Sequence, residues 1–157
     1  MRITPIVAFI MLALSSRAQT TKSSRSEQTH FTTEDERVQH PIKVPESVRA
    51  IIDEDENMLS ASEVHLAGPS EKDIVVMAVG SLRGANITSF WVFRPTDRGF
   101  EMLLDAPAHD LIVKNSRSNG YRDIELLSAT AVVVSTVIVR FDGKKYQTYK
   151  TRSETIR

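Results

Sequence analysis

The chain has 157 residues, with 20 basic and 20 acidic side chains and no cysteine. This length suits one domain with a real core. The balanced charge argues against a dedicated nucleic-acid-binding protein or a polybasic membrane-surface protein, since both carry a basic excess. Without cysteine, zinc–thiolate sites, cysteine nucleophiles and thiol redox chemistry are excluded.

The first eighteen residues, MRITPIVAFIMLALSSRA, have the three parts of a secretory signal. Arg2 supplies the positive charge, and the apolar stretch after it is too short to span a bilayer comfortably. Ser16 and Ala18 are the small residues expected before a cleavage site. We therefore predict a signal peptide over 1–18, export to the periplasm or the extracellular space, and no transmembrane segment once the signal is removed.

Residues 19–40 are polar, rich in Ser and Thr and almost without aliphatic side chains. Such a stretch buries too little apolar surface to offset its chain entropy, so it is predicted to be a disordered leader. A single domain is expected over 41–152, followed by a tail at 153–157. An exported domain without disulfides is common in a bacterial envelope and unusual among small secreted eukaryotic domains.

One amphipathic helix is predicted at the start of this domain. Val44, Val48, Ile51 and Ile52 recur at the spacing of one helical face, which predicts a helix over about 45–56. No later segment has a comparable helical period.

Eight β-rich runs separated by turn signals follow the helix. They are SEVHLA, KDIVVMAV, TSFWVFR, GFEMLLD, HDLIVKN, YRDIELLSAT, AVVVSTVIVRF and KKYQTYKT. Asn119-Gly120 and Asp142-Gly143 favour tight hairpin turns. The predicted fold class is α+β, with one N-terminal helix packed on a twisted antiparallel β-meander of about 7–8 strands. The lack of βαβ alternation excludes a nucleotide-binding parallel sheet.

The stretch GANITSFWVFR contains the only tryptophan of the chain. Phe90, Trp91, Val92 and Phe93 are apolar at consecutive positions, so both faces of this strand should be covered, one of them by the helix. We therefore predict a core strand here, in preference to an aromatic ligand platform.

Any binding surface is then expected among the polar residues that flank the aromatic strand. The candidate binding residues are Arg83, Asn86, Arg94 and Tyr121. Arginine, asparagine and tyrosine side chains supply the hydrogen bonds and stacking that recognition of a protein or a glycan needs.

No metal or cofactor site is expected. Asp53, Asp55 and Asn57 have the spacing that opens a calcium loop, but Met58 stands where that loop needs Gly and Val64 where it needs Glu. The four histidines lack metal-ligand spacing. No phosphate-binding glycine loop and no GxSxG motif is present.

Arg122 and Asp123 follow the Asn119-Gly120 turn and should alternate across the outgoing strand. One of them should therefore face inward, where a charge requires a partner. A structural ion pair or strand-end cap is the main interpretation, and a ligand-binding role is the alternative.

Four ordered motifs over residues 45–150 resemble a family of exported bacterial proteins whose role is uncharacterised. They are GANITSFWVFR, GFEMLLDAPAHDLIVK, NGYRDI and RFDGKKY. The resemblance implies export and an antiparallel fold, and it implies no particular activity.

The segment AGPSEKDIVV is similar to a family segment that is like half of an FG-GAP propeller repeat. Asp73 matches the aspartate of that segment. Gly68, Pro69 and Ser70 replace its acidic loop positions, which argues against a calcium site in this loop. By analogy, sheets of this kind serve recognition more often than catalysis.

Together these features predict an exported, non-enzymatic envelope protein that binds a protein or cell-wall partner. One alternative is a small periplasmic hydrolase that uses His109 with a carboxylate such as Asp105 or Asp123. Another is an inhibitor or immunity protein against a wall-degrading enzyme, with a projecting loop at 80–86 or 115–120.

Overall fold

The computed structural model describes residues 27–38 and 40–156. The predicted signal peptide and the leader up to residue 26 therefore lie outside the described residues. The helices and strands in chain order are β1 (His30–Thr32), α1 (Glu46–Ile52), η1 (Glu56–Met58), β2 (Leu59–Val64), β3 (Asp73–Ala78), η2 (Gly80–Leu82), β4 (Thr88–Thr96), β5 (Gly99–Ala108), β6 (Asp110–Ser118), β7 (Tyr121–Ala129), β8 (Val133–Phe141) and β9 (Tyr146–Thr155).

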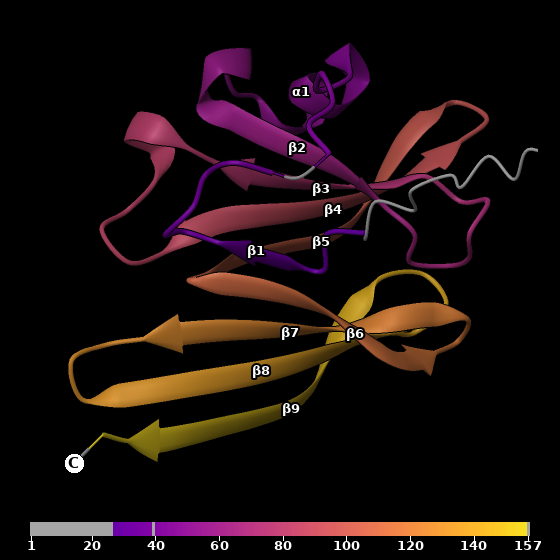
Figure 1. Cartoon of the computed structure of the whole chain (residues 1–157). Helices are drawn as coiled ribbons and strands as arrows, with labels where there is room; N and C mark the ends of the chain where they lie inside the picture. Colours follow the sequence, from indigo (N-terminus) through magenta and orange to yellow (C-terminus); the bar gives the residue numbers. More distant parts are fainter. Residues whose placement is uncertain (1–26, 39, 157) are drawn as a thin grey trace, which may run out of the picture.

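The strands form two stacked antiparallel sheets (Figure 1). One sheet has the order β2-β3-β4-β5 and the other has the order β1-β6-β7-β8-β9. The α+β class and the antiparallel pairing are confirmed. The structure differs from the predicted single meander because β5 does not pair with β6. Only His109 separates these two strands, and there the chain passes from one sheet to the other.

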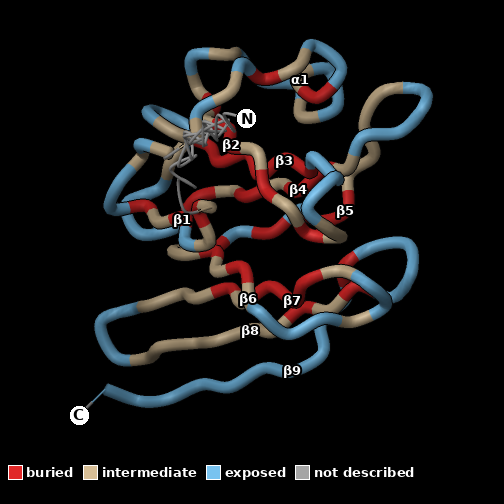
Figure 2. The backbone as a smooth tube through the Cα atoms, turned by 45° about the vertical axis from the view of Figure 1, so that its right-hand side comes forward, coloured by how far each residue is buried: buried red, intermediate tan, exposed pale blue. Residues whose placement is uncertain are grey.

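A large apolar core fills the space between the sheets. Phe90 and Val92 of β4 are fully buried there, and Leu111 and Ile124 approach from the opposite sheet. Figure 2 shows the buried segments concentrated on β3, β4, β6 and β7. This core accounts for one covered face of the aromatic strand.

Helix α1 covers the other face of β4 through a second, smaller core. Val48 and Phe93 are fully buried in it, and the half-buried Trp91 packs against it. The prediction of a core strand covered by the helix on one side is confirmed. The helix is shorter than predicted because Asp53 adopts the left-handed conformation with φ 62°, which ends α1 at Ile52.

Residues 27–38 belong to the fold, although the whole stretch from 19 to 40 was predicted to be a leader. Strand β1 pairs with β6, and Phe31 lies opposite Leu111 with 1% of its surface exposed. Gln28 and Thr33 are also buried. One aromatic residue in a polar stretch is a weak signal, and the backbone hydrogen bonds to the edge of β6 supply the rest.

Strands β2–β5 and β6–β9 are two consecutive four-stranded meanders. Each carries an Asp-Ile pair near the start of its second strand, at 73–74 and at 123–124, fifty positions apart. In both meanders the aspartate accepts a hydrogen bond from the residue seven positions earlier. The donors are the Leu66 amide at 3.1 Å and the Ser116 hydroxyl at 2.7 Å. An Asp-Ile pair thus occurs in the second strand of both meanders, with a backbone donor in one and a hydroxyl donor in the other.

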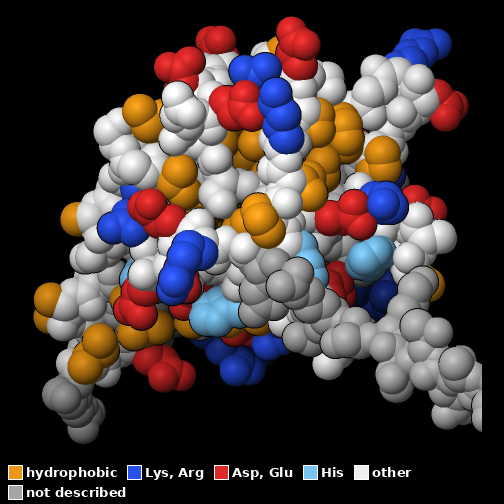
Figure 3. All heavy atoms as spheres, turned by 45° about the horizontal axis from the view of Figure 1, so that its top comes forward, with side chains coloured by type: hydrophobic (Ala, Val, Ile, Leu, Met, Phe, Trp, Pro, Cys, Tyr) orange, Lys and Arg blue, Asp and Glu red, His pale blue; other side chains and the backbone are white. Residues whose placement is uncertain are grey.

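Strand β9 lies at the edge of its sheet and is exposed along nearly its whole length (Figure 2). It extends to Thr155, so the predicted tail at 153–157 is largely part of this strand. The turn before it is held by Asp142, whose carboxylate accepts the amides of Lys144 and Lys145 at 2.7 and 2.8 Å. Acidic and basic side chains are intermixed on the face that Figure 3 shows, in agreement with the balanced composition.

Candidate functional site

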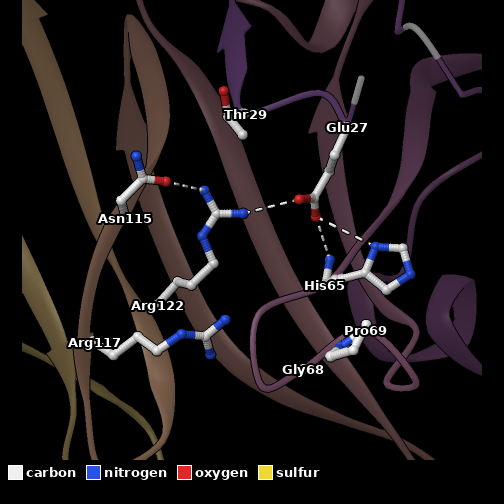
Figure 4. Close-up of a pocket in the computed structure, with 8 residues that line it drawn as sticks. All are labelled: Glu27, Thr29, His65, Gly68, Pro69, Asn115, Arg117 and Arg122. Atoms are coloured by element: carbon white, nitrogen blue, oxygen red, sulfur yellow. Dashed lines mark hydrogen bonds and ion pairs between the residues drawn. The ribbon is translucent and has the colours of Figure 1, made fainter. Parts of the chain in front are cut away.

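A pocket of about 500 Å³ opens where three segments meet: the residues before β1, the β2–β3 loop, and the bulged part of the β6–β7 hairpin (Figure 4). Its lining is mainly polar or charged. The lining residues are Glu27, Thr29, His65, Gly68, Pro69, Asn115, Arg117 and Arg122.

Arg122 forms the inner wall of this pocket and is only 7% exposed. Its guanidinium donates to the Lys114 carbonyl at 2.7 Å and to Asn115 Oδ1 at 3.3 Å, and it pairs with Glu27 Oε2 at 2.9 Å. A buried charge is tolerated only with partners of this kind. The predicted inward ion pair is therefore present, and its partner is Glu27.

Asp123 is buried together with Arg122, although simple strand alternation would place one of the two outside. The register of β6 and β7 shifts between Val113 and Arg117, and Ser116 of this irregular part of β6 donates its hydroxyl to Asp123, so both residues of β7 are covered. Asp123 is 1% exposed, and its Oδ2 lies 3.5 Å from Arg140 Nε. Asp123 thus forms a separate polar contact with Ser116 of β6 and Arg140 of β8, outside the lining of the pocket.

The carboxylate of Glu27 has a donor on each oxygen. Oε2 faces Arg122 Nη1, and Oε1 accepts the backbone amide of His65 at 2.5 Å. The ring Nδ1 of His65 lies 3.4 Å from Oε1. Figure 4 shows these three groups converging on the carboxylate from two elements.

Arg117 joins the two hairpin loops at the outer side of the pocket. Its Nη1 donates to the carbonyls of Leu66, Ala67 and Gly120 at 2.8, 2.9 and 2.9 Å. Among the described residues no ion pair connects Arg117 to a carboxylate. Since Glu27 balances only Arg122, the pocket keeps one positive charge in excess.

Two buried groups lie beneath the pocket. Tyr146 donates its hydroxyl to the Arg122 carbonyl at 2.7 Å, and burial raises the pKa of this phenol. Burial also raises the pKa of Asp73, although the amides of Leu66 and Ala67 lower it in part. Oδ1 of Asp73 is buried without a hydrogen-bond partner among the described residues. Asp73 is therefore a buried carboxylate whose charged form is disfavoured by desolvation.

The substitution Asp73→Asn should remove the part of the pH dependence of the free energy of unfolding that comes from the ionisation of Asp73. Because the pKa of Asp73 is raised in the folded state, its ionisation costs folding free energy as pH rises from the ordinary value of 3.8 through the raised value. We expect the stability of D73N relative to the wild type to increase over that pH range, measured by urea unfolding at several pH values. Asp142→Asn should show the opposite trend, because the Lys145 and Lys144 amides lower the pKa of Asp142. A difference between D73N and the wild type that does not change with pH would contradict this account.

The four candidate binding residues do not converge on one site. Arg83 lies at one end of β4, where it donates to the Thr33 carbonyl and pairs with Glu36 at 3.2 Å. Asn86 is exposed in the same region, and its carbonyl lies 3.1 Å from His109 Nδ1. These residues stand apart from the pocket between the hairpin loops.

Arg94 and Tyr121 come together at the other end of β4. Arg94 binds Glu101 Oε2 at 2.7 Å, and its guanidinium lies 5.8 Å from the centre of the Phe141 ring. Tyr121 stacks on the same ring at 4.2 Å. The Glu101 carboxylate, followed by the Tyr121 hydroxyl, raises the pKa of Arg94. Both residues thus serve internal contacts.

The structure does not bring His109 together with the hydroxyl and carboxylate groups that the hydrolase alternative requires. Nδ1 of His109 lies 3.0 Å from the Thr33 hydroxyl, which is buried and therefore closed to a substrate. Asp123 bonds Ser116, as described above, and Asp105 lies on β5 opposite Trp91. The carboxylates that do approach His109, those of Glu34 and Asp110, are 3.8 and 3.9 Å away, beyond hydrogen-bond reach.

Sequence reasoning missed Glu27, His65, Asn115 and Arg117 as lining residues. They belong to segments that the fold brings together, and none stands in a recognisable motif. The one available signal was the repeated Asp-Ile pair, since His65 and Asn115 each precede it by eight positions. Matching positions of the two meanders therefore face each other across the pocket.

Comparison with known proteins adds no identification, because no protein-family model, curated protein or solved structure matches the chain. In residues 27–38 and 40–156, no helix has the length and apolar character needed to cross a membrane. Within the same part of the chain, no three His, Asp or Glu side chains are placed to share a metal ion.

Proposed function

We propose that this is an exported, non-enzymatic envelope protein that binds a protein or cell-wall partner through the pocket between its two hairpin loops. The observation that carries the proposal is the pocket itself: a hollow of about 500 Å³ with a net positive lining built on a buried arginine. Fixed donors in a partly desolvated hollow are typical of recognition sites. The signal-like residues 1–18 and the resemblance to exported bacterial proteins support the location.

Blocking the pocket should abolish capture of the partner. A Cβ added at Gly68 meets no heavy atom within 4 Å and Gly68 lines the pocket, so Gly68→Trp introduces a large group at the pocket with no backbone clash at its Cβ. Ser70→Trp is the matched control, because Ser70 is exposed on the same loop and does not line the pocket. With full-length tagged protein and envelope extract, we expect at least about tenfold less bound partner for G68W, and wild-type capture for S70W. Equal capture by both variants would rule out the pocket.

Export has its own test. If residues 1–18 are a secretory signal, the protein recovered from the envelope fraction should begin at Gln19. Intact-mass measurement of the tagged chain from its native host checks this directly. An uncleaved chain that stays in the cytoplasm would contradict the envelope location while leaving the pocket test intact.

A second candidate function, inhibition of a wall-degrading enzyme, is favoured by one observation. Residues 80–87 form a loop that projects from the sheet beside β3 and β4 (Figure 1) and carries Leu82 and Ile87, which are 37% and 42% exposed. Gly84 keeps this loop tightly turned, since its amide bonds the Ile87 carbonyl at 2.9 Å. Exposed apolar side chains on a stiff loop are suited to insertion into a partner.

A further inference from the structure

The Glu27 carboxylate is held as a bound ligand would be. Its two oxygens take separate N–H donors, Arg122 Nη1 at 2.9 Å and the His65 backbone amide at 2.5 Å. The two donors come from different sheets, so a planar group with two acceptor oxygens bridges them. A carboxylate has this geometry, and charge-assisted bonds of this type are strong.

Both donors are fixed before any ligand arrives. The His65 amide directly follows β2, and the Arg122 side chain is oriented by the Lys114 carbonyl and by Asn115. The Arg122 backbone amide also bonds the Leu66 carbonyl at 3.0 Å, which ties β7 to the β2–β3 loop. Such preorganised donors lower the entropic cost of binding.

The backbone that carries Glu27 is anchored independently of its side chain. The Thr29 carbonyl accepts the Val113 amide at 2.7 Å, and β1 then pairs with β6. The Glu27 side chain, which is 28% exposed, can therefore leave the donors without unpairing β1.

The pocket has room and charge for more than the Glu27 carboxylate. It extends past Glu27 to Gly68 and Pro69, and Arg117 brings a second guanidinium to its outer side (Figure 4). Arg117 has no carboxylate partner among the described residues. Its guanidinium therefore also attracts an anionic molecule that enters the pocket.

We propose that the pocket is a receptor for a carboxylate and that Glu27 occupies it as a tethered, displaceable ligand of the same chemistry. The inference rests on the proposed function for the use of this pocket. A tethered carboxylate has a high effective concentration, so it weakens the binding of a free one. A partner's carboxylate must therefore bind the two donors strongly enough to displace Glu27.

The test uses Glu27→Gln, which keeps the shape of the side chain and removes its charge. Glu36→Gln is the matched control, since Glu36 lies in the same segment and pairs with Arg83 outside the pocket. Full-length wild type, E27Q and E36Q are titrated with sodium acetate at constant ionic strength. The readout is the NMR shift of the His65 amide, which moves downfield when it donates to a carboxylate.

We expect acetate to bind E27Q at least about tenfold more tightly than the wild type, because the tethered competitor is gone. E36Q should match the wild type. Equal acetate affinity in wild type and E27Q, or no movement of the His65 amide in E27Q, would overturn the proposal. Inorganic phosphate that binds E27Q as tightly as acetate would also overturn it, because the site would then select charge alone.

Two further probes identify the source of the carboxylate. N-acetyl-alanyl-alanine with a free terminus and its C-terminal amide are compared on E27Q, alongside acetate. Tighter binding of the free peptide than of acetate, with no binding of the amide, assigns the site to a peptide terminus. Equal binding of peptide and acetate assigns it to small acids. If G68W still captures the envelope partner while E27Q gains acetate affinity, the proposed function fails and this inference stands.

Discussion

Replacing Arg122 with alanine is expected to lower the free energy of unfolding by about 1–3 kcal/mol. The change leaves the Glu27 carboxylate and the carbonyl of Lys114 without their buried donor. The cost arises because these acceptors lose a fixed donor that water replaces only in part. Urea unfolding followed by circular dichroism at neutral pH measures the effect.

Arg37→Ala provides the contrast. Arg37 also pairs with a carboxylate, that of Asp35 at 2.9 Å, but its side chain is 89% exposed. Solvent screens such a pair, so its loss should leave the free energy of unfolding close to that of the wild type. Similar destabilisation by R122A and R37A would show that the pocket arginine is not the buried structural charge described here.

Phe90→Ala is expected to destabilise the fold by about 3–5 kcal/mol, the range for an aromatic side chain removed from a packed core. Phe90 is fully buried between the two sheets, where Leu111 and Ile124 of the second sheet share its core. Its removal leaves a cavity at the contact that holds the sheets together. Thermal and urea unfolding of the purified variant give the value.

Val132→Ala is the control for the aromatic core. Val132 lies in the turn before β8 and is 59% exposed, so this substitution should change stability by less than about 0.5 kcal/mol. If F90A were no more destabilising than V132A, the two sheets would not be packed through β4.

All eight predicted β-rich runs correspond to strands, because alternation and turn chemistry are local properties that the sequence carries directly. The turns at Asn119-Gly120 and Asp142-Gly143 show why: Asn119, Gly120 and Gly143 have positive φ, as tight hairpins require. The partition into two sheets could not be predicted in this way. Local periodicity does not specify that β5 and β6, adjacent in the chain, pair with different partners.

The candidate site was harder to predict than the fold. The contacts of the Glu27 carboxylate connect it to residues 38 and 95 positions later, and no local pattern indicates such distances. Arg83 and Arg94 have residue types suited to binding, but the fold gives them internal partners, Glu36 and Glu101. Residue type alone does not distinguish an arginine that holds the fold together from one that faces a ligand.

Hydrogen exchange of the wild type with and without its captured envelope partner tests the central claim most directly. Binding in the pocket predicts new protection at residues 65–70 and 115–122, which carry the two hairpin loops, and unchanged exchange at 80–87. Protection confined to residues 80–87 would contradict the pocket and establish the projecting loop as the binding surface.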